Sequence, residues 1–345
     1  MNTTLKHWKE AATLILAAGR GRGFTPRAPL TGESGFMPNA YVFPGGVVDA
    51  SDFSSEWLDI FRSFTNSPTF GLRSVKQHLE TRPPIFATDR LKLGSPIPGE
   101  VALRICALRE TFEESGEKNV KKHKGLCSEL TKWRALVNQN PSNFIRMCRE
   151  LQVLPNIWAL HEWGNWLTPA SRYGTTRFDT AFFICCLQEI PHTLQDDKEI
   201  ERFQWSTPSE ILQSYQAQKL WIAPPQFYEL SRLCRFPLLN DLHNFASQRA
   251  TAGCEQWMPV VVSNDEHLIS LLPGDKLYPV DSPRDSEAAK NTVPPSKDHQ
   301  DASPLHRIVI SDRYTLRVQI TITPKYNHVL PVAHSAVSHD SKSQL

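Results

Sequence analysis

The sequence predicts an α+β fold with a small β-rich segment near the C-terminal end. Two apolar runs that lie far apart in the chain, Thr13–Leu16 and Arg177–Cys186, are typical of buried strands. Between them, Val101–Ser115 has the apolar spacing of a helix that packs against a core. Beyond Cys254 the pattern changes to short strands, which we expect at 258–263, 267–272, 305–310 and 316–322.

The remaining elements follow from periodicity and from capping and turn residues. Ala40–Phe43 indicates a strand that ends at a Pro-Gly-Gly turn, and Ser206–Glu210 carries the capping signal of a helix start. Further helices are expected at 57–61, 74–79, 127–137, 142–151, 224–233 and 238–250, with a proline-rich loop at 81–98. We therefore divide the chain into a main domain (8–250, with an insertion at 53–100), a β appendage (255–325, with a disordered loop at 275–303) and a tail (326–345).

Composition limits the classes of protein to which the chain can belong. The 345 residues are 40% hydrophobic and 21% charged, which is ordinary for a soluble globular protein. A formal net charge of +2 gives no reason to expect nucleic acid or an anionic membrane as partner. No apolar run is long enough for a membrane span, and the seven cysteines contain no Cys-x-x-Cys pair. We therefore expect neither a disulfide framework nor a structural zinc site. The same cysteine usage predicts a protein of a reducing compartment.

A cluster of charge closes the helix predicted at 101–115. Glu110, Glu113 and Glu114 stand at i, i+3 and i+4, so their carboxylates share one face of the helix. Carboxylates held together repel one another unless a cation lies among them, and Mg²⁺ or Mn²⁺ prefers such oxygen ligands. Arg109 stands four residues before Glu113 and can orient that carboxylate, while Gly116 allows the helix to end.

This string, Arg-Glu-x-x-Glu-Glu-x-Gly, resembles the second half of the Nudix box, the signature of hydrolases that cut nucleoside diphosphates linked to another moiety. The first half of the box is matched within Tyr41–Asp52, with Gly46 as its glycine and Asp52 as its acid. The spacing differs, because fifty-six residues separate Asp52 from Arg109 where the usual box has seven. Thr111 and Glu117 also stand where the pattern prefers apolar residues.

The resemblance extends over roughly residues 10 to 245 and is closest to one branch of the family, the peroxisomal coenzyme A diphosphatases. It includes Phe36–Pro38, Trp166–Pro169 and Arg177–Phe183. It implies an α/β/α sandwich with a mixed sheet and a helical and loop insertion inside the box. The implied reaction is metal-dependent hydrolysis of the diphosphate bond of coenzyme A and acyl-coenzyme A. The products would be 3′,5′-ADP and (acyl-)4′-phosphopantetheine.

The same resemblance implies roles for particular residues. The catalytic set would be Arg109, Glu110, Glu113 and Glu114, with the three glutamates as ligands of Mg²⁺ or Mn²⁺. Either Glu110 or one of two acids in a late loop, Glu199 and Glu201, would be the general base. The residues expected near the substrate are Gly45, Gly46, Arg20 and Arg177, with Arg22 and Arg27 as further phosphate contacts.

The last three residues, Ser343-Gln344-Leu345, resemble the Ser-Lys-Leu signal that the peroxisomal import receptor binds. The sequence thus predicts that receptor as a partner and the peroxisome as the location, with cytoplasm or mitochondrion as alternatives. A polar tail without function is the other interpretation of these residues.

Three other functions stay open. The same hydrolysis could act on a nucleotide sugar, a dinucleotide or a capped RNA end, although the near-neutral charge does not favour nucleic acid. The fold could instead be an inactive binding module. The glycine-rich loop Leu16–Gly21 also resembles the phosphate loop of sugar nucleotidyltransferases, but no repeated βα units follow it.

Overall fold

The computed structural model describes residues 8–19, 28–31, 40–114, 124–169, 177–190, 203–263, 267–279 and 303–332. Part of the residues considered in the sequence analysis lies outside these ranges: 20–22, Arg27, 36–38, 115–117, Glu199, Glu201, most of the loop predicted to be disordered (275–303), and 343–345.

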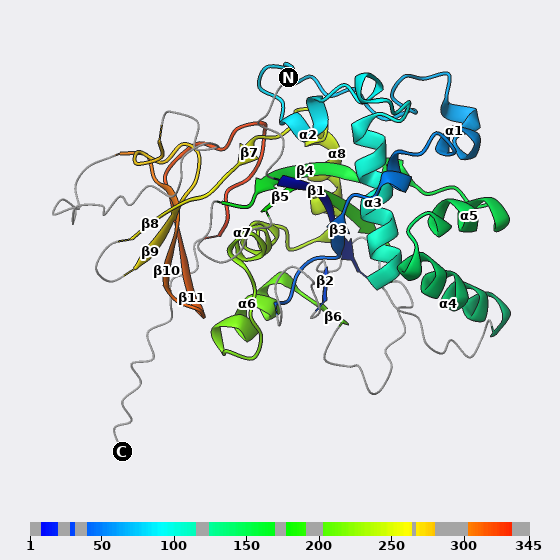
Figure 1. Ribbon diagram of the computed structural model, residues 1–345. Helices are drawn as coiled ribbons and strands as arrows, with labels where there is room; N and C mark the ends of the chain where they lie inside the picture. The colour runs from blue at the N-terminus through cyan, green and yellow to red at the C-terminus, as the bar shows by residue number, and fades with distance from the viewer. Residues whose placement is uncertain are drawn as a thin grey trace.

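The fold is built on a five-stranded mixed sheet in the order β3-β1-β5-β4-β7 (Figure 1). At its centre β1 (Trp8–Ala18) runs parallel to β5 (Arg177–Leu187), and these strands contain the two apolar runs seen in the sequence. The outer strands are β3 (Gly45–Val47), β4 (His161–Leu167) and β7 (Gln256–Trp257). The two central strands are confirmed as predicted.

Alternate residues of the central strands enter two different cores. In β1, Ile15 and Ala17 face one side, while Leu14 and Leu16 face the other. The first side is covered by α6 (Pro208–Gln216), α7 (Pro224–Leu233) and α8 (Leu239–Arg249). The second side is covered by α3 (Gly99–Glu114). Because strand side chains alternate with period two, this burial on both faces produces the predicted α/β/α sandwich.

The insertion and the segment after α3 form a further core on the outer face of α3. These segments contain the helices α1 (Trp57–Ile60), α2 (Pro84–Ala87), α4 (Lys124–Gln139) and α5 (Asn143–Glu150), with the 3-10 helices Ala50–Phe53, Arg62–Phe64, Leu91–Leu93 and Ile157–Ala159. The buried residues of α2, Ile85 and Phe86, pack instead in the core between α3 and the sheet. In the further core, Trp57 and Phe61 pack against Val101 and Ile105 of α3. Helix α3 is therefore fixed on two faces, by the sheet and by the insertion.

Three local predictions were wrong. Residues 74–79 form no helix, and the loop predicted at 81–98 contains α2 and a 3-10 turn. Ala40–Phe43 is not a strand, because Tyr41 makes only a single bridge, to Ile222. The strand lies later, at Gly45–Val47, where the backbone can pair with β1. Pro44 has no N–H to donate, and its carbonyl instead accepts from Leu14 N at 2.8 Å.

A second, four-stranded antiparallel sheet follows in the order β11-β10-β9-β8. Its strands are β8 (Val260–Ser263), β9 (Leu268–Leu271), β10 (His306–Asp312) and β11 (Thr315–Ile320), close to the predicted positions. A short antiparallel pair, β2 (Ala28–Thr31) with β6 (Phe203–Ser206), forms a third sheet.

The four-stranded sheet packs directly against the main domain. Leu272 and Ile308 belong to the same core as α6–α8. Residues 326–332, which the sequence placed in the tail, lie back against α7, where Val332 N donates to Ser231 O at 3.0 Å. No helix among the described residues is both long enough and apolar enough to cross a lipid bilayer.

Candidate active site

Arg109 organises the acidic end of α3. Its side chain is only 2% exposed, and its guanidinium Nε and Nη2 each lie 2.9 Å from an oxygen of Asp52. Its Nη1 lies 2.7 Å from Glu110 Oε1 and 2.8 Å from Glu113 Oε1. Nη2 also donates to Val47 O at 3.2 Å. All five N–H groups of the guanidinium are thus used, and the arginine binds three carboxylates at once.

Asp52 is the acid that joins the two halves of the box across the insertion. It is 1% exposed and lies in a 3-10 helix, Ala50–Phe53, whose N-terminus is closed by a capping box between Asp49 and Asp52. The Asp52 Oδ2 atom accepts from Asp49 N at 2.9 Å as well as from Arg109. The sequence matched Asp52 to the motif but gave it no role, because its contact with Arg109 crosses fifty-six intervening residues.

Gly46 lies directly against the Glu110 carboxylate. A Cβ at position 46 would stand 2.4 Å from Glu110 Cδ and 2.5 Å from Oε2. Only glycine therefore allows the Glu110 carboxylate to occupy its observed position. A Cβ at Gly45 would stand 2.5 Å from Ala12 O on β1. The sequence placed the two glycines in a turn after a strand, but they lie in strand β3 instead. Both are needed where β3 passes between β1 and α3.

The three glutamates of α3 differ in their contacts with Arg109. Arg109 brings Glu110 and Glu113 together, and their side chains are 16% and 13% exposed. Glu114 lies partly exposed one turn beyond Glu110, at the last described position of α3. No group of three His, Cys, Asp or Glu residues is arranged as a metal centre in the part of the chain that the structure describes.

The acidic pair nevertheless fits a divalent ion. Only Oε1 of Glu110 and Oε1 of Glu113 contact Arg109, and the second oxygen of each has no hydrogen bond to any described residue. Burial raises the pKa of Glu110, and the neighbouring Glu113 carboxylate adds to the rise, although Arg109 opposes it. A hard cation at these oxygens would relieve that repulsion, and carboxylate oxygens are the ligands that it prefers.

Arg177 does not lie with the carboxylates. It pairs with Trp8 at one end of the central strands, four residues from the level of Ala12 and Gly46, or about 13 Å along the sheet. Its guanidinium lies 3.8 Å from the centroid of the Trp8 ring, and its Nε donates to Thr168 O at 3.2 Å. Burial lowers its pKa. In this structure Arg177 contacts the rim of the sheet, and the predicted phosphate contact stays a prediction.

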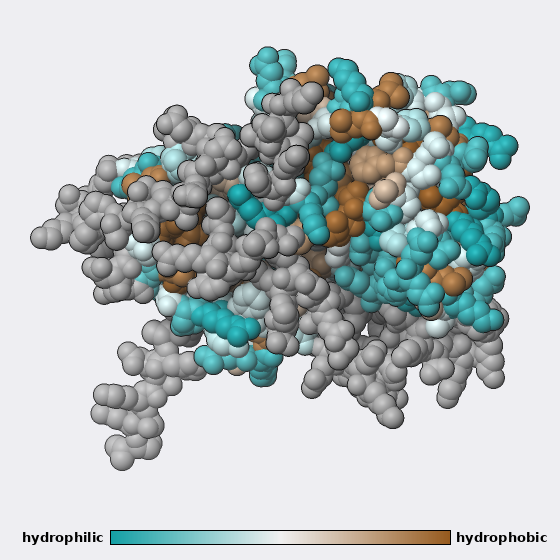
Figure 2. Space-filling view, viewed as in Figure 1, coloured by the Kyte–Doolittle hydropathy of each residue, from teal (hydrophilic) through white to brown (hydrophobic). Residues whose placement is uncertain are grey.

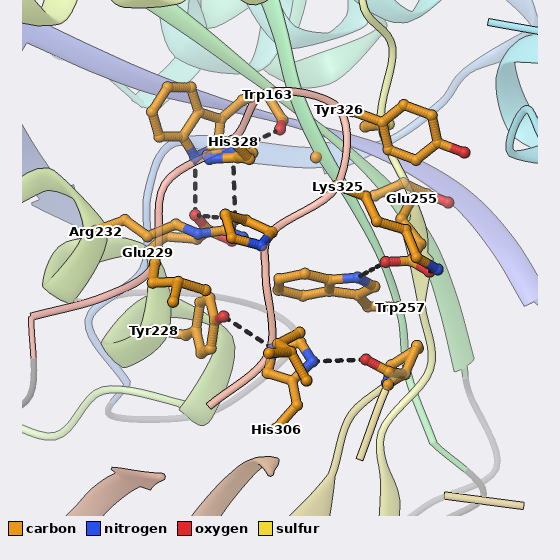
Figure 3. A pocket seen from close by; sticks show the side chains of 18 of the residues that line it. Trp163, Tyr228, Glu229, Arg232, Glu255, Trp257, His306, Lys325, Tyr326 and His328 are labelled. Carbon is orange, nitrogen blue, oxygen red and sulfur yellow. Dashed lines mark hydrogen bonds and ion pairs between the residues drawn. The ribbon is translucent and has the colours of Figure 1, made fainter. Parts of the chain in front are cut away.

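A separate cavity of about 100 Å³ lies where α7 meets the C-terminal segments (Figure 3). The Nε1 atoms of Trp163 and Trp166 donate to Glu229 at 2.8 and 2.9 Å, and Arg232 Nη1 lies 3.2 Å from the same carboxylate. Arg232 also lies over the ring of Trp257, at 4.6 Å. These contacts satisfy the buried ion pair and connect α7 to strands β4 and β7 of the five-stranded sheet.

Comparison with known proteins agrees with this geometry. Residues 8–233 match a family model described as the NUDT19 Nudix domain, and residues 261–321 match one described as the NUDT19 C-terminal domain. The chain is 46% identical to a Xenopus laevis protein and 45% identical to a Gallus gallus protein, over the full length of each. It is 39% identical to a Homo sapiens protein over 94% of each chain. All three are named acyl-coenzyme A diphosphatase NUDT19.

The chain belongs to the Nudix hydrolase family, in its NUDT19 branch. Hydrolases of this family generally use divalent metal ions.

Proposed function

We propose that this chain hydrolyses the diphosphate bond of coenzyme A and of its acyl esters, with Mg²⁺ or Mn²⁺ as cofactor. The observation that carries the proposal is the Arg109 centre, which holds Glu110 and Glu113 side by side in a chain similar over its full length to proteins named for this activity. The products are 3′,5′-ADP and 4′-phosphopantetheine or its acyl ester.

Glu110 and Glu113 would hold the metal ion, with Glu114 as the third carboxylate on the same face of α3. When bound, the ion neutralises charge on the diphosphate and lowers the pKa of a water molecule. Arg109 keeps the two carboxylates in position, and Asp52 keeps Arg109 in position. This arrangement reduces the reorganisation needed when the substrate arrives.

The reaction adds the oxygen of water to one phosphorus and breaks that atom's bond to the bridging oxygen, so that each product carries a terminal phosphate. The water must lose a proton. Glu110 is one candidate to accept it, because its carboxylate lies beside Glu113 in the acidic group that Arg109 gathers. Glu199 or Glu201 is the alternative base.

The test is chromatographic analysis of coenzyme A incubated with Mg²⁺ and either wild type, Glu113→Gln or Glu114→Gln. Glu150→Gln is a matched control, because Glu150 forms only an exposed pair with Arg146 on α5. We expect 3′,5′-ADP from wild type and from the control, and a loss of at least about 100-fold in the other two variants.

Cleavage of a nucleotide sugar or capped RNA instead of coenzyme A would support metal-dependent hydrolysis but would refute coenzyme A as the substrate. Inactivity on every diphosphate would favour a binding module.

The proposal includes location in the peroxisome, with Ser343-Gln344-Leu345 as the segment that the import receptor binds. A fluorescent protein carrying the last twelve residues of the chain should enter peroxisomes. The same fusion without Ser343-Gln344-Leu345 should not. Diffuse fluorescence from both fusions would contradict this assignment.

A further inference from the structure

The insertion forms a groove of about 690 Å³. One wall comes from residues 65–79 and the other from residues 88–98 together with the first turn of α3. Buried Phe70 and Leu72 line it, as do Leu58 and Val75. None of the carboxylates that Arg109 binds is among the residues lining this groove, so it is a separate feature of the fold.

The insertion also holds the most exposed large hydrophobic side chains among the described residues. Leu79 is 74% exposed, Leu91 72% and Leu93 67%, and every other such side chain is at most 46% exposed. Leu79 and Leu91 line the groove. Hydrophobic side chains are visible on this face of the molecule over the insertion (Figure 2). Single exposed leucines are ordinary, but two on the walls of one large groove indicate a site for an apolar ligand.

The charged groups of the groove are already paired. Arg82 contacts Glu162 at 2.8 Å and also Glu100, while Arg90 binds both oxygens of Glu10, at 2.7 and 3.0 Å. A ligand with a phosphate or a free carboxylate would therefore find no uncompensated cation at these arginines.

The groove lies within reach of the catalytic carboxylates. Glu100 lines it, and Glu110 follows ten residues later on α3, which is about 15 Å along the axis at the rise of an α-helix. The other link is Ser95, a lining residue whose Oγ donates to Phe53 O at 2.9 Å. Phe53 directly follows Asp52, the residue that binds Arg109. One 3-10 turn thus joins the edge of the groove to the catalytic centre.

This separation matches the length of the pantetheine arm. About thirteen bonds separate the diphosphate of coenzyme A from its sulfur, and an extended chain gains roughly 1.2 Å per bond, or about 15 Å in all. A thioester group would therefore reach the groove while the diphosphate lies at the carboxylates. Its acyl chain is neutral and apolar, and the lining of the groove offers it apolar side chains such as Phe70, Leu79 and Leu91.

We propose that the groove within the insertion binds the acyl chain of an acyl-coenzyme A substrate. This inference rests on the proposed function and gives the insertion a role in substrate selection. Free coenzyme A leaves the groove unused. A long acyl chain gains contacts with Leu79 and Leu91, and these contacts lower KM.

The 3-10 turn Leu91–Leu93 provides a matched pair of variants. Leu91 lines the groove, whereas Leu93, almost as exposed, is not among its lining residues. We expect Leu91→Asn to raise KM for dodecanoyl-coenzyme A about tenfold, from the lost burial of one leucine side chain. It should leave kcat and the hydrolysis of free coenzyme A unchanged. Leu93→Asn should leave both substrates unchanged.

Equal effects of Leu91→Asn on both substrates, or none on either, would overturn the inference. If wild type cleaves no coenzyme A, the proposed function is refuted, but the role of the groove can still be tested by measuring binding. In a titration calorimeter, dodecanoyl-coenzyme A should then bind more tightly than coenzyme A, and Leu91→Asn should remove the difference. Equal affinities in wild type would refute the acyl site.

Discussion

Replacing Gly46 with alanine tests how closely the Glu110 carboxylate must be held. The added Cβ would stand 2.4 Å from Glu110 Cδ, whereas ordinary contacts between carbon atoms begin near 3.5 Å. The carboxylate must therefore retreat by about 1 Å. The backbone can stay in place, because the atoms in the way belong to the end of a flexible side chain.

A displacement of about 1 Å in a catalytic group costs roughly 100-fold in rate. We expect kcat on coenzyme A to fall by this factor in Gly46→Ala, while the free energy of unfolding changes by less than about 1 kcal/mol. Chromatography of the products gives the first quantity, and urea unfolding followed by circular dichroism gives the second.

Gly164→Ala is the control, because a Cβ on Gly164 in β4 would meet nothing within 4 Å. It should keep both activity and stability. A folded Gly46→Ala protein with activity within about twofold of wild type would refute the assignment of Glu110 to the reaction centre. Loss of stability and activity together would show instead that the glycine serves the packing of β3.

Two further predictions concern stability. Asp52→Asn removes the most buried of the three carboxylates that pair with Arg109 and should destabilise the protein by about 3 kcal/mol. Glu56→Gln in an exposed pair should cost less than about 0.5 kcal/mol, and equal costs of the two substitutions in urea unfolding would contradict the buried pair. Burial lowers the pKa of His306 from 6.5 to about 4, so the folded state resists protonation that the unfolded state accepts. The free energy of unfolding therefore has its full value, as far as His306 is concerned, above about pH 6.5. It decreases as the pH falls toward 4, by about 2 kcal/mol between pH 7 and pH 5. In urea unfolding, His306→Gln should show a fall smaller by that amount, and an unchanged pH dependence would contradict the lowered pKa.

Local patterns in the sequence predicted most of the elements, because the physical causes are local. Apolar period-two runs form β1 and β5, and the capping box between Thr207 and Glu210 begins α6 as expected. The contact of Arg109 with Glu113 was also predictable, since residues four apart on a helix are neighbours.

What the sequence did not predict depends on contacts between distant residues. Asp52 received no role because fifty-six residues separate it from its partner, Arg109. Strand β3 was placed too early, because the apolar residues Tyr41–Phe43 looked more like a strand than Gly45–Val47 does. Pairing with β1, which no single segment encodes, decides where that strand lies. The groove likewise arises from loops without periodicity.

The insertion leaves the Nudix box functional because each of its ends is tied to α3. At one end, Asp52 binds Arg109 with two hydrogen bonds of 2.9 Å, and at the other the chain enters α3 directly at Gly99. Between these points Trp57 and Phe61 pack on the outer face of the same helix. Closing a longer loop costs little entropy once its ends are fixed, and the buried aromatic residues offset that cost. The insertion can therefore carry a binding surface of its own without moving the carboxylates on which hydrolysis depends.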